Sequence, residues 1–318
     1  MFARYGHTTE AKQDLVQHTG VPADRVSIHT ADVADEASVI AAVQAAAAAH
    51  GQINAVITSA GISGPARFEG ITAAALQRTL QINVVGTRNV IYAALPWLKQ
   101  ASAARIACVS SAAGLTGVYG FTAYSASKFA VIGFAQSLRQ ELTPWRIPVT
   151  VHCPPDTDTP MLEHENKSKP PLCAKVSESG GLCSAEHVAT DIVDGMCAGD
   201  FLLSSGFDTT MAAYAAVGMG PSATLAQGLL SVLLAGPLRA VSLAYQAYWS
   251  YLIRSDAAQA QIEATQALDV AKAAGQVVLN PSGSPSSDPA SAGGPGAAAS
   301  ATPSATDEGM RRRSPGGK

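Results

Sequence analysis

The sequence is poor in charged residues, and the charges that it has are balanced. Only 14% of its 318 residues are Asp, Glu, Lys or Arg, and the formal net charge is −3. A nucleic-acid-binding surface needs an excess of Lys and Arg. The one basic run, Arg311 to Arg313, lies in a tail rich in Gly, Pro, Ser and Ala. The composition therefore excludes nucleic acid as an expected partner.

Cysteine is also scarce, and its spacing argues against two kinds of site. The five cysteines are an odd number and include no Cys-x-x-Cys pair. We therefore expect neither a disulfide framework nor a cysteine-ligated metal. Cys108 and Cys153 lie in apolar stretches, which predicts reduced, buried thiols in a cytosolic setting. The first residues, Met-Phe-Ala-Arg-Tyr-Gly-His, contain no apolar signal segment.

The first two thirds of the chain alternate short apolar runs with helical patterns. This alternation predicts an α/β fold in which helices cover both faces of a parallel, doubly wound sheet of the Rossmann type. Residues that follow such strands collect at one edge of the sheet, where ligands bind. The expected strands are 26–31, 53–58, 105–109, 148–152 and 201–203. The expected helices are 35–49, 72–79, 81–99, a helix through Tyr124 to about 142, and 184–197. A long loop is expected at 153–183.

A long segment at 209–253 carries a single charge, Arg239. Because Pro237 and Arg239 divide it into pieces shorter than the roughly 20 residues that a spanning helix needs, we expect a re-entrant or interfacial hairpin on a membrane. The alternative is a pair of buried helices or a dimer face.

We expect an amphipathic helix at 256–274. The predicted parts of the chain are a Rossmann-type domain at 1–207, an apolar helical extension at 208–275 and a disordered tail at 276–318.

Three side chains form the most informative pattern. Tyr124 and Lys128 are four residues apart, so on a helix they share one face. A lysine ammonium beside a phenol favours the phenolate, so we expect Lys128 to lower the pKa of Tyr124 and to make it a usable acid or base. Ser111 lies thirteen residues upstream, at the end of an apolar strand, where its hydroxyl can hold a carbonyl oxygen beside the tyrosine.

In this order and spacing, Ser111, Tyr124 and Lys128 resemble the catalytic set of the short-chain dehydrogenase/reductases. The resemblance implies that Asn83 holds a water that feeds protons to the lysine, with a simple helix-packing amide as the alternative. It implies that Arg4 pairs with the 2′-phosphate of the cofactor, although an ordinary surface arginine fits equally well. Thr58 stands where the family has an Asn that braces the sheet. The residues that the resemblance assigns to NADP(H) are Arg4, Asp32, Val33, Ala60, Gly61, Tyr124, Lys128, Pro154, Thr157 and Thr159.

Three strings narrow the resemblance to the 3-ketodihydrosphingosine reductases. They are Gly-Phe-Thr-Ala-Tyr-Ser-Ala-Ser-Lys-Phe-Ala at 120–130, Pro-Pro-Asp-Thr-Asp-Thr-Pro at 154–160 and Glu-Asn-Lys-Ser-Lys-Pro at 165–170. The resemblance implies NADPH-dependent reduction of the C3 ketone of a long-chain lipid, on the cytosolic face of the endoplasmic reticulum membrane. A steroid or retinoid ketone is the alternative substrate, and a homo-oligomer is a further expectation.

One motif of the family is missing. The glycine-rich loop Thr-Gly-x-x-x-Gly-x-Gly, which lets backbone amides approach a pyrophosphate, does not occur in the sequence. The resemblance therefore implies an N-terminally truncated chain without the first strand of the sheet. The alternative function is a non-catalytic, membrane-associated product that cannot bind the cofactor. Asp156 and Asp158 have no ligand partner at helical spacing nearby, so no metal site is expected.

Overall fold

A computed structural model describes residues 8–177, 181–216, 221, 224–255, 265–266 and 269. The chain divides into two units, Met1–Ala267 and Leu268–Lys318, and every element named below belongs to the first. Arg4, the tail at 276–318 and most of the helix predicted at 256–274 lie outside the described residues. The predicted boundaries at 207 and 275 stay predictions.

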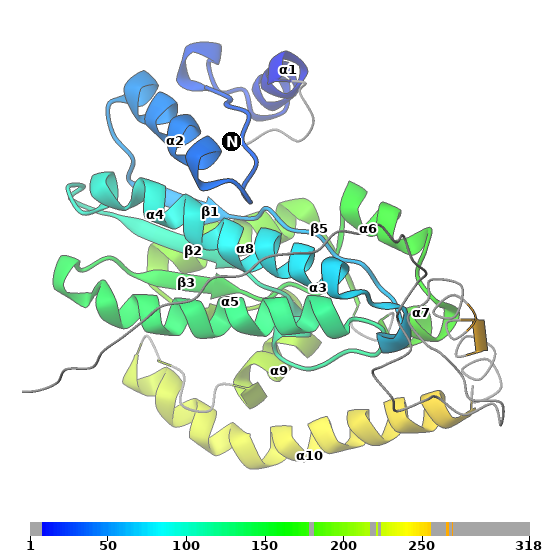
Figure 1. Ribbon diagram of the computed structural model, residues 1–318. Coiled ribbons are helices and arrows are strands. Elements are labelled where there is room, and N and C mark those ends of the chain that lie inside the picture. The colour runs from blue at the N-terminus through cyan, green and yellow to red at the C-terminus, as the bar shows by residue number, and fades with distance from the viewer. Residues whose placement is uncertain are drawn as a thin grey trace, which may run out of the picture. The chain divides into compact units, whose positions relative to one another are not determined.

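The core of the first unit is a parallel sheet of four strands (Figure 1). Each strand lies beside the next in the order β1-β2-β3-β6, and Ile106 of β2 pairs with Val149 of β3. The strands are short and mostly apolar, because both faces of the sheet are covered. The predicted doubly wound α/β sheet is confirmed. The strands are β1 (Ala55–Thr58), β2 (Arg105–Val109), β3 (Val149–His152) and β6 (Leu202–Leu203).

Helices pack on both faces of this sheet, as Figure 1 shows. Ile106 and Cys108 point into the larger core cluster with α4 and α5, whereas Ala107 between them points to α8. Helix α2 begins after an Asp35 cap, ends at Gly51 in a left-handed conformation, and packs on α4. The helices are α2 (Glu36–His50), α4 (Gly86–Leu98), α5 (Thr122–Glu141) and α8 (Ala185–Ala198).

Shorter helical segments lie between these elements and before them. Helix α3 (Ala73–Leu80) runs through a π-helical turn, η3 (Gln81–Val85), directly into α4, so the break predicted at residue 80 is absent. At the start of the chain lies α1 (Thr8–Thr19). The short 3-10 segments are η1 (Ala23–Arg25), η2 (Phe68–Gly70), η4 (Ala112–Gly114) and η5 (Thr143–Trp145).

The strand predicted at 26–31 is wrong, because these residues form neither strand nor helix. A strand exists only when its N–H and C=O groups pair with a neighbour. β1 is the end of the sheet order, and in the described part of the chain no strand pairs with its other edge. The apolar run at 26–31 therefore has no partner to hold it extended.

The long loop predicted at 153–183 is also wrong. It contains β4 (Asp156–Asp158), α6 (Pro160–Asn166), α7 (Pro171–Ser177) and β5 (Leu182–Ser184), with β4 and β5 forming a second, two-stranded parallel sheet. The prolines suggested a loop, but Pro160 and Pro171 occupy the first turns of helices, where a missing N–H costs nothing. The hydroxyl of Thr159 caps α6 by accepting from the N–H of Leu162.

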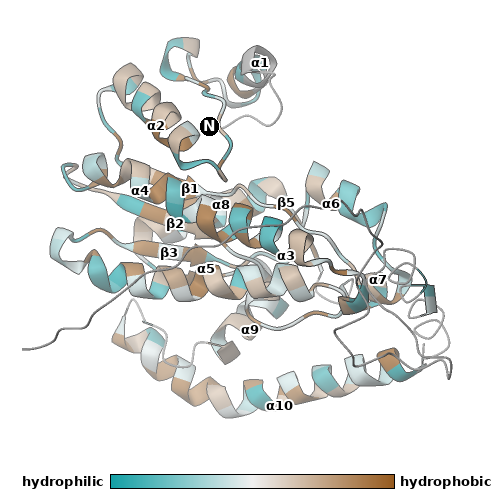
Figure 2. Cartoon of the chain, viewed as in Figure 1, coloured by the Kyte–Doolittle hydropathy of each residue, from teal (hydrophilic) through white to brown (hydrophobic). Residues whose placement is uncertain are grey.

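The apolar segment forms α9 (Phe207–Ala216) and α10 (Leu225–Ser255). Helix α10 is continuous over 31 residues and passes through Pro237, so the predicted hairpin is wrong. A proline removes one backbone hydrogen bond from the helix. The hydrogen bonds of the long helical stretches on either side of Pro237 keep α10 continuous. By length and composition α10 is able to cross a membrane, and very little of it is buried. Figure 2 shows apolar residues along much of its length.

Candidate active site

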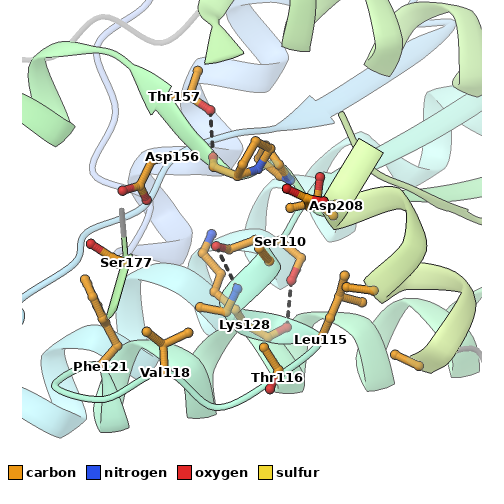
Figure 3. A pocket seen from close by; sticks show the side chains of 18 of the residues that line it. Ser110, Leu115, Thr116, Val118, Phe121, Lys128, Asp156, Thr157, Ser177 and Asp208 are labelled. Atoms are coloured by element: carbon orange, nitrogen blue, oxygen red, sulfur yellow. Dashed lines mark hydrogen bonds between the residues drawn. The ribbon is translucent and has the colours of Figure 1, made fainter. Parts of the chain in front are cut away.

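A cavity of about 800 Å³ opens at the carboxyl ends of β2 and β3 (Figure 3). Loops that follow these strands form one wall, and α9 and α10 form another. The cavity brings together seven of the residues predicted from the sequence. They are Gly61, Ser111, Tyr124, Lys128, Pro154, Thr157 and Thr159.

Ser111 and Tyr124 form a hydrogen-bonded pair on the cavity wall. Ser111 caps the short helix η4, and its Oγ accepts from the N–H of Ala113 at 3.1 Å. Tyr124 lies in the first turn of α5. A carbonyl oxygen that enters the cavity beside this pair can accept a hydrogen bond from both hydroxyls.

The pKa of Tyr124 is raised in the structure, whereas the sequence predicted that Lys128 would lower it. Burial raises the pKa of Tyr124 above its ordinary value, the hydrogen bond with Ser111 opposes this, and the negative charges of Glu165 and Asp156 raise the pKa further. The Lys128 Nζ lies 5.5 Å from the centre of the phenol ring. Tyr124 is therefore protonated throughout the neutral range, which suits it to donate a proton and not to take one.

Lys128 is a buried cation that lines the cavity. Its Nζ donates to the carbonyl oxygen of Val109 at 3.0 Å, and burial lowers its pKa to about 8. Its own carbonyl accepts from Ser110 Oγ at 2.9 Å, which ties α5 to the end of β2. A Cβ at Gly114 would lie 2.5 Å from Ser110 Oγ, so only glycine permits this approach. At neutral pH this ammonium releases a proton more readily than an exposed lysine does.

Asn83 fastens the loop after β1 to α5. It lies in the π-helical turn η3, and its Oδ1 accepts from Ile62 N at 2.8 Å. Its Nδ2 donates to Ile62 O and to Ser127 Oγ, each at 2.9 Å. Both amide hydrogens are thus used within the protein, and the water-holding role of Asn83 stays a prediction. Its bonds position Gly61 and Lys128 beside each other.

The structure keeps three other predicted residues away from the cavity lining. The Asp32 carboxylate accepts from its neighbour Ala34 N at 2.9 Å, and Val33 is buried against α4, where Asn89 Nδ2 donates to its carbonyl at 3.0 Å. Ala60 follows β1 and is exposed. Arg4 lies outside the described residues. Assignment of these four residues to a cofactor stays a prediction.

Two groups of lining residues were not named individually from the sequence. Glu165 and Ser177 line the cavity from the segment predicted as a loop, and Lys169 bonds to both of them. The four-residue spacing of Glu165 and Lys169 was a visible signal for this ion pair. The second group comes from α10 and includes Tyr245 and Trp249, which lie in the segment predicted as a hairpin.

A second polar cluster resembles a Ser-His-Asp set but has the wrong connectivity for catalysis. Ser205 Oγ donates to Asp191 Oδ2 at 2.5 Å and bonds His152 Nε2 at 3.0 Å. The serine is therefore in the middle, and its proton goes to a carboxylate instead of a histidine. Burial lowers the pKa of His152 to about 4, so the ring is neutral at physiological pH. This cluster ties β3 to α8.

The cavity fits the nicotinamide end of a dinucleotide. A Cβ at Gly61 would lie 3.2 Å from Asn83 Oδ1 and 3.6 Å from Lys128 Nζ, so the absent side chain keeps open the floor beside the lysine. Pro154, Thr157 and Thr159 line the same cavity. The described residues include no glycine-rich loop, and we assign no contact to a pyrophosphate.

Known proteins resemble this chain in sequence and in fold. A family model described as short chain dehydrogenase matches residues 2–170. The chain is 34% identical to a mouse 3-ketodihydrosphingosine reductase over 246 residues, which is 77% of this chain and 74% of the relative. It is 38% identical to a 3-dehydrosphinganine reductase of Arabidopsis thaliana over 243 residues, 76% of this chain and 72% of the relative.

Solved structures agree on the fold. The NADP-bound structure of ElxO superposes with a TM-score of 0.55 at 22% identity, covering 64% of this chain and 84% of that one. Levodione reductase superposes with a TM-score of 0.56 at 23% identity, covering 62% and 81%. The sheet, the site at the carboxyl ends of β2 and β3, and the match of the family model lead to one conclusion: this chain belongs to the short-chain dehydrogenase family.

Proposed function

We propose that this chain reduces the C3 ketone of 3-ketodihydrosphingosine to dihydrosphingosine with NADPH. One observation carries the proposal: the cavity that holds Ser111 and Tyr124 continues to apolar residues of α9 and α10. A long-chain amino ketone needs both a proton donor for its carbonyl and an apolar wall for its chain. The relatives at 34% and 38% identity carry the names of reductases of this substrate.

The residues of the site divide the work of ketone reduction among themselves. NADPH supplies the hydride when it is bound. Ser111 and Tyr124 hydrogen-bond the carbonyl oxygen, and Tyr124 donates its proton to the oxygen as negative charge develops there. Lys128, with its lowered pKa, stabilises the negative charge that the donation leaves on the phenol. Gly61, Pro154, Thr157, Thr159, Tyr124 and Lys128 are the residues that would hold the nicotinamide and its ribose, and Asn83 positions the lysine.

An assay of the full chain tests this function. We expect dihydrosphingosine, identified by mass spectrometry, when the chain is given NADPH and 3-ketodihydrosphingosine, and a lower kcat/KM with NADH. Steroid and retinoid ketones serve as competing substrates, and a higher kcat/KM for either would overturn the assignment. A chain that neither quenches NADPH fluorescence on binding nor turns over any ketone would be the non-catalytic alternative.

We also propose that α10 attaches the chain to the cytosolic face of the endoplasmic reticulum membrane. Several of its large apolar side chains are exposed, among them Val232 and Leu233. Burying apolar side chains in the acyl region stabilises attachment by about 25 cal/mol per Å². Such a surface suits an enzyme whose substrate resides in a bilayer.

Replacing Val232 and Leu233 together by Asp is expected to reduce co-flotation with phosphatidylcholine vesicles by at least about tenfold, because each charge opposes insertion. Phe68→Asp is the matched control, since Phe68 is an equally exposed apolar residue outside α10. Equal flotation of the double variant and the unchanged chain would show that α10 is not the attachment surface.

A further inference from the structure

Three charged side chains meet at one end of the cavity. Lys169 Nζ lies 2.7 Å from Glu165 Oε1 and 3.8 Å from Asp156 Oδ2. The side chains of Lys169 and Glu165 are only 3% and 7% exposed, whereas that of Asp156 is 35% exposed. They come from β4, from α6 and from the segment between α6 and α7. Asp156 and Glu165 both line the cavity.

The charges of this group do not cancel. Two carboxylates share one ammonium, and the ammonium lies much closer to Glu165. The second oxygen of Glu165 accepts from Ser63 Oγ at 2.5 Å, so both of its oxygens have partners. Lys169 also bonds Ser177 Oγ at 3.2 Å. The surplus negative charge therefore resides on Asp156, the most exposed member of the group.

Two further observations locate this charge relative to the chemistry. The negative charges of Asp156 and Glu165 raise the pKa of Tyr124, which places them within electrostatic range of the proton donor. Burial raises the pKa of Asp156 even though Lys169 opposes the change, so its carboxylate lacks full compensation. Figure 3 shows Asp156 and Ser177 on one side of Lys128 and Asp208 on the other.

We propose that Asp156 binds the primary ammonium of the substrate and selects long-chain ketones that carry a free amine beside the carbonyl. This inference rests on the proposed function and adds a specificity-determining residue to it. In such an amino ketone the nitrogen is on the carbon next to the carbonyl. Tyr124 and Asp156 line the same cavity, so a substrate held there by its carbonyl oxygen at Tyr124 can present its ammonium to Asp156. The apolar chain then extends along α9 and α10.

The pairing explains why a free amine would be selected over its derivatives. A protonated amine donates a charge-assisted hydrogen bond to the Asp156 carboxylate in a partly desolvated site. An N-acylated amine has no charge and adds bulk against β4, and a ketone without the amine leaves the carboxylate without a cation. A site built around a polar group rejects the analogue that lacks it more strongly than an apolar pocket rejects an extra methylene.

Direct binding tests the proposal without requiring turnover. The probe is a water-soluble short-chain 2-amino-1,3-diol, titrated against its N-acetyl derivative, with tryptophan fluorescence as the readout because Trp249 lines the cavity. We expect the unchanged full-length chain to bind the free amine at least about tenfold more tightly, and Asp156→Asn to remove that difference. Asp158→Asn is the matched control, since Asp158 is an exposed acid on the same strand outside the cavity lining.

Unchanged amine binding by Asp156→Asn would overturn the proposal. If this variant does not fold, as judged by circular dichroism, Asp156→Ser gives the same test. Kinetics then separates this inference from the proposed function. A chain that reduces the ketone with NADPH while Asp156→Asn keeps the preference for the amine refutes only the inference. A chain that shows amine selection through Asp156 but no ketone reduction refutes only the proposed function.

Discussion

Tyr124→Phe is expected to lower kcat for ketone reduction by about 10² to 10⁴-fold, the range typical for loss of a positioned acid. The substitution removes only the hydroxyl that is hydrogen-bonded to Ser111. Burial raises the pKa of this hydroxyl, so in the unchanged chain it holds its proton until a stronger base, the developing alkoxide, forms beside it. Stopped-flow or steady-state measurement of NADPH oxidation with the lipid ketone checks the prediction.

Comparing the effect of Tyr124→Phe on kcat with its effect on ligand binding distinguishes a proton donor from a residue that only packs against the ligands. We expect the dissociation constants of NADPH and of the amino diol to change by less than about threefold in Tyr124→Phe, because the ring that lines the cavity is retained. Tyr92→Phe removes an exposed hydroxyl from α4 and serves as the matched control. Turnover above a tenth of the unchanged rate in Tyr124→Phe would exclude this residue as the proton donor.

The cavity joins two chemical environments that the sequence keeps far apart. Its polar end is built from the loops after β2 and β3 and from β4 and α6, and its apolar end is built from α9 and α10. Helix α10 contributes to both the cavity and the exposed apolar surface, since Tyr245 and Trp249 line the cavity while Val232 and Leu233 are exposed. A lipid that approaches along the outside of α10 would therefore reach a wall of the site made by the same helix.

The elements predicted correctly from the sequence are those whose own residues determine their structure. The strand at 105–109 is apolar after Arg105, and the helix after Asp35 has a capping residue at its start and a glycine at its end. The predicted site residues after β2, on α5 and after β3 line one cavity. Strand ends in a parallel sheet meet at one edge, so their order along the chain is sufficient to place them.

The predictions that are wrong concern features that depend on neighbours distant in sequence. The run at 26–31 needed a pairing strand, and the prolines at 160 and 171 required knowledge of where each helix starts. The pKa of Tyr124 followed burial and the charges of Asp156 and Glu165, which no local pattern brings near it. Pro237 was treated as a helix break, although a long helix tolerates one lost hydrogen bond.

Lys169→Met is expected to reduce the free energy of unfolding by about 3 to 5 kcal/mol, the cost of leaving one charge of a buried pair without its partner. Glu165 is 7% exposed and lies 2.7 Å from Lys169, so its carboxylate would keep only the hydrogen bond from Ser63. Lys167→Met is the matched control, because Lys167 is exposed at the end of α6 and its loss should change stability by less than about 0.5 kcal/mol. Urea unfolding followed by circular dichroism measures both.

Adding Glu165→Gln to Lys169→Met removes the unpaired charge and should restore part of the lost free energy of unfolding. A Lys169→Met chain within about 1 kcal/mol of the unchanged protein would mean that Glu165 needs no cation, and the surplus charge that we assign to Asp156 would then have no basis.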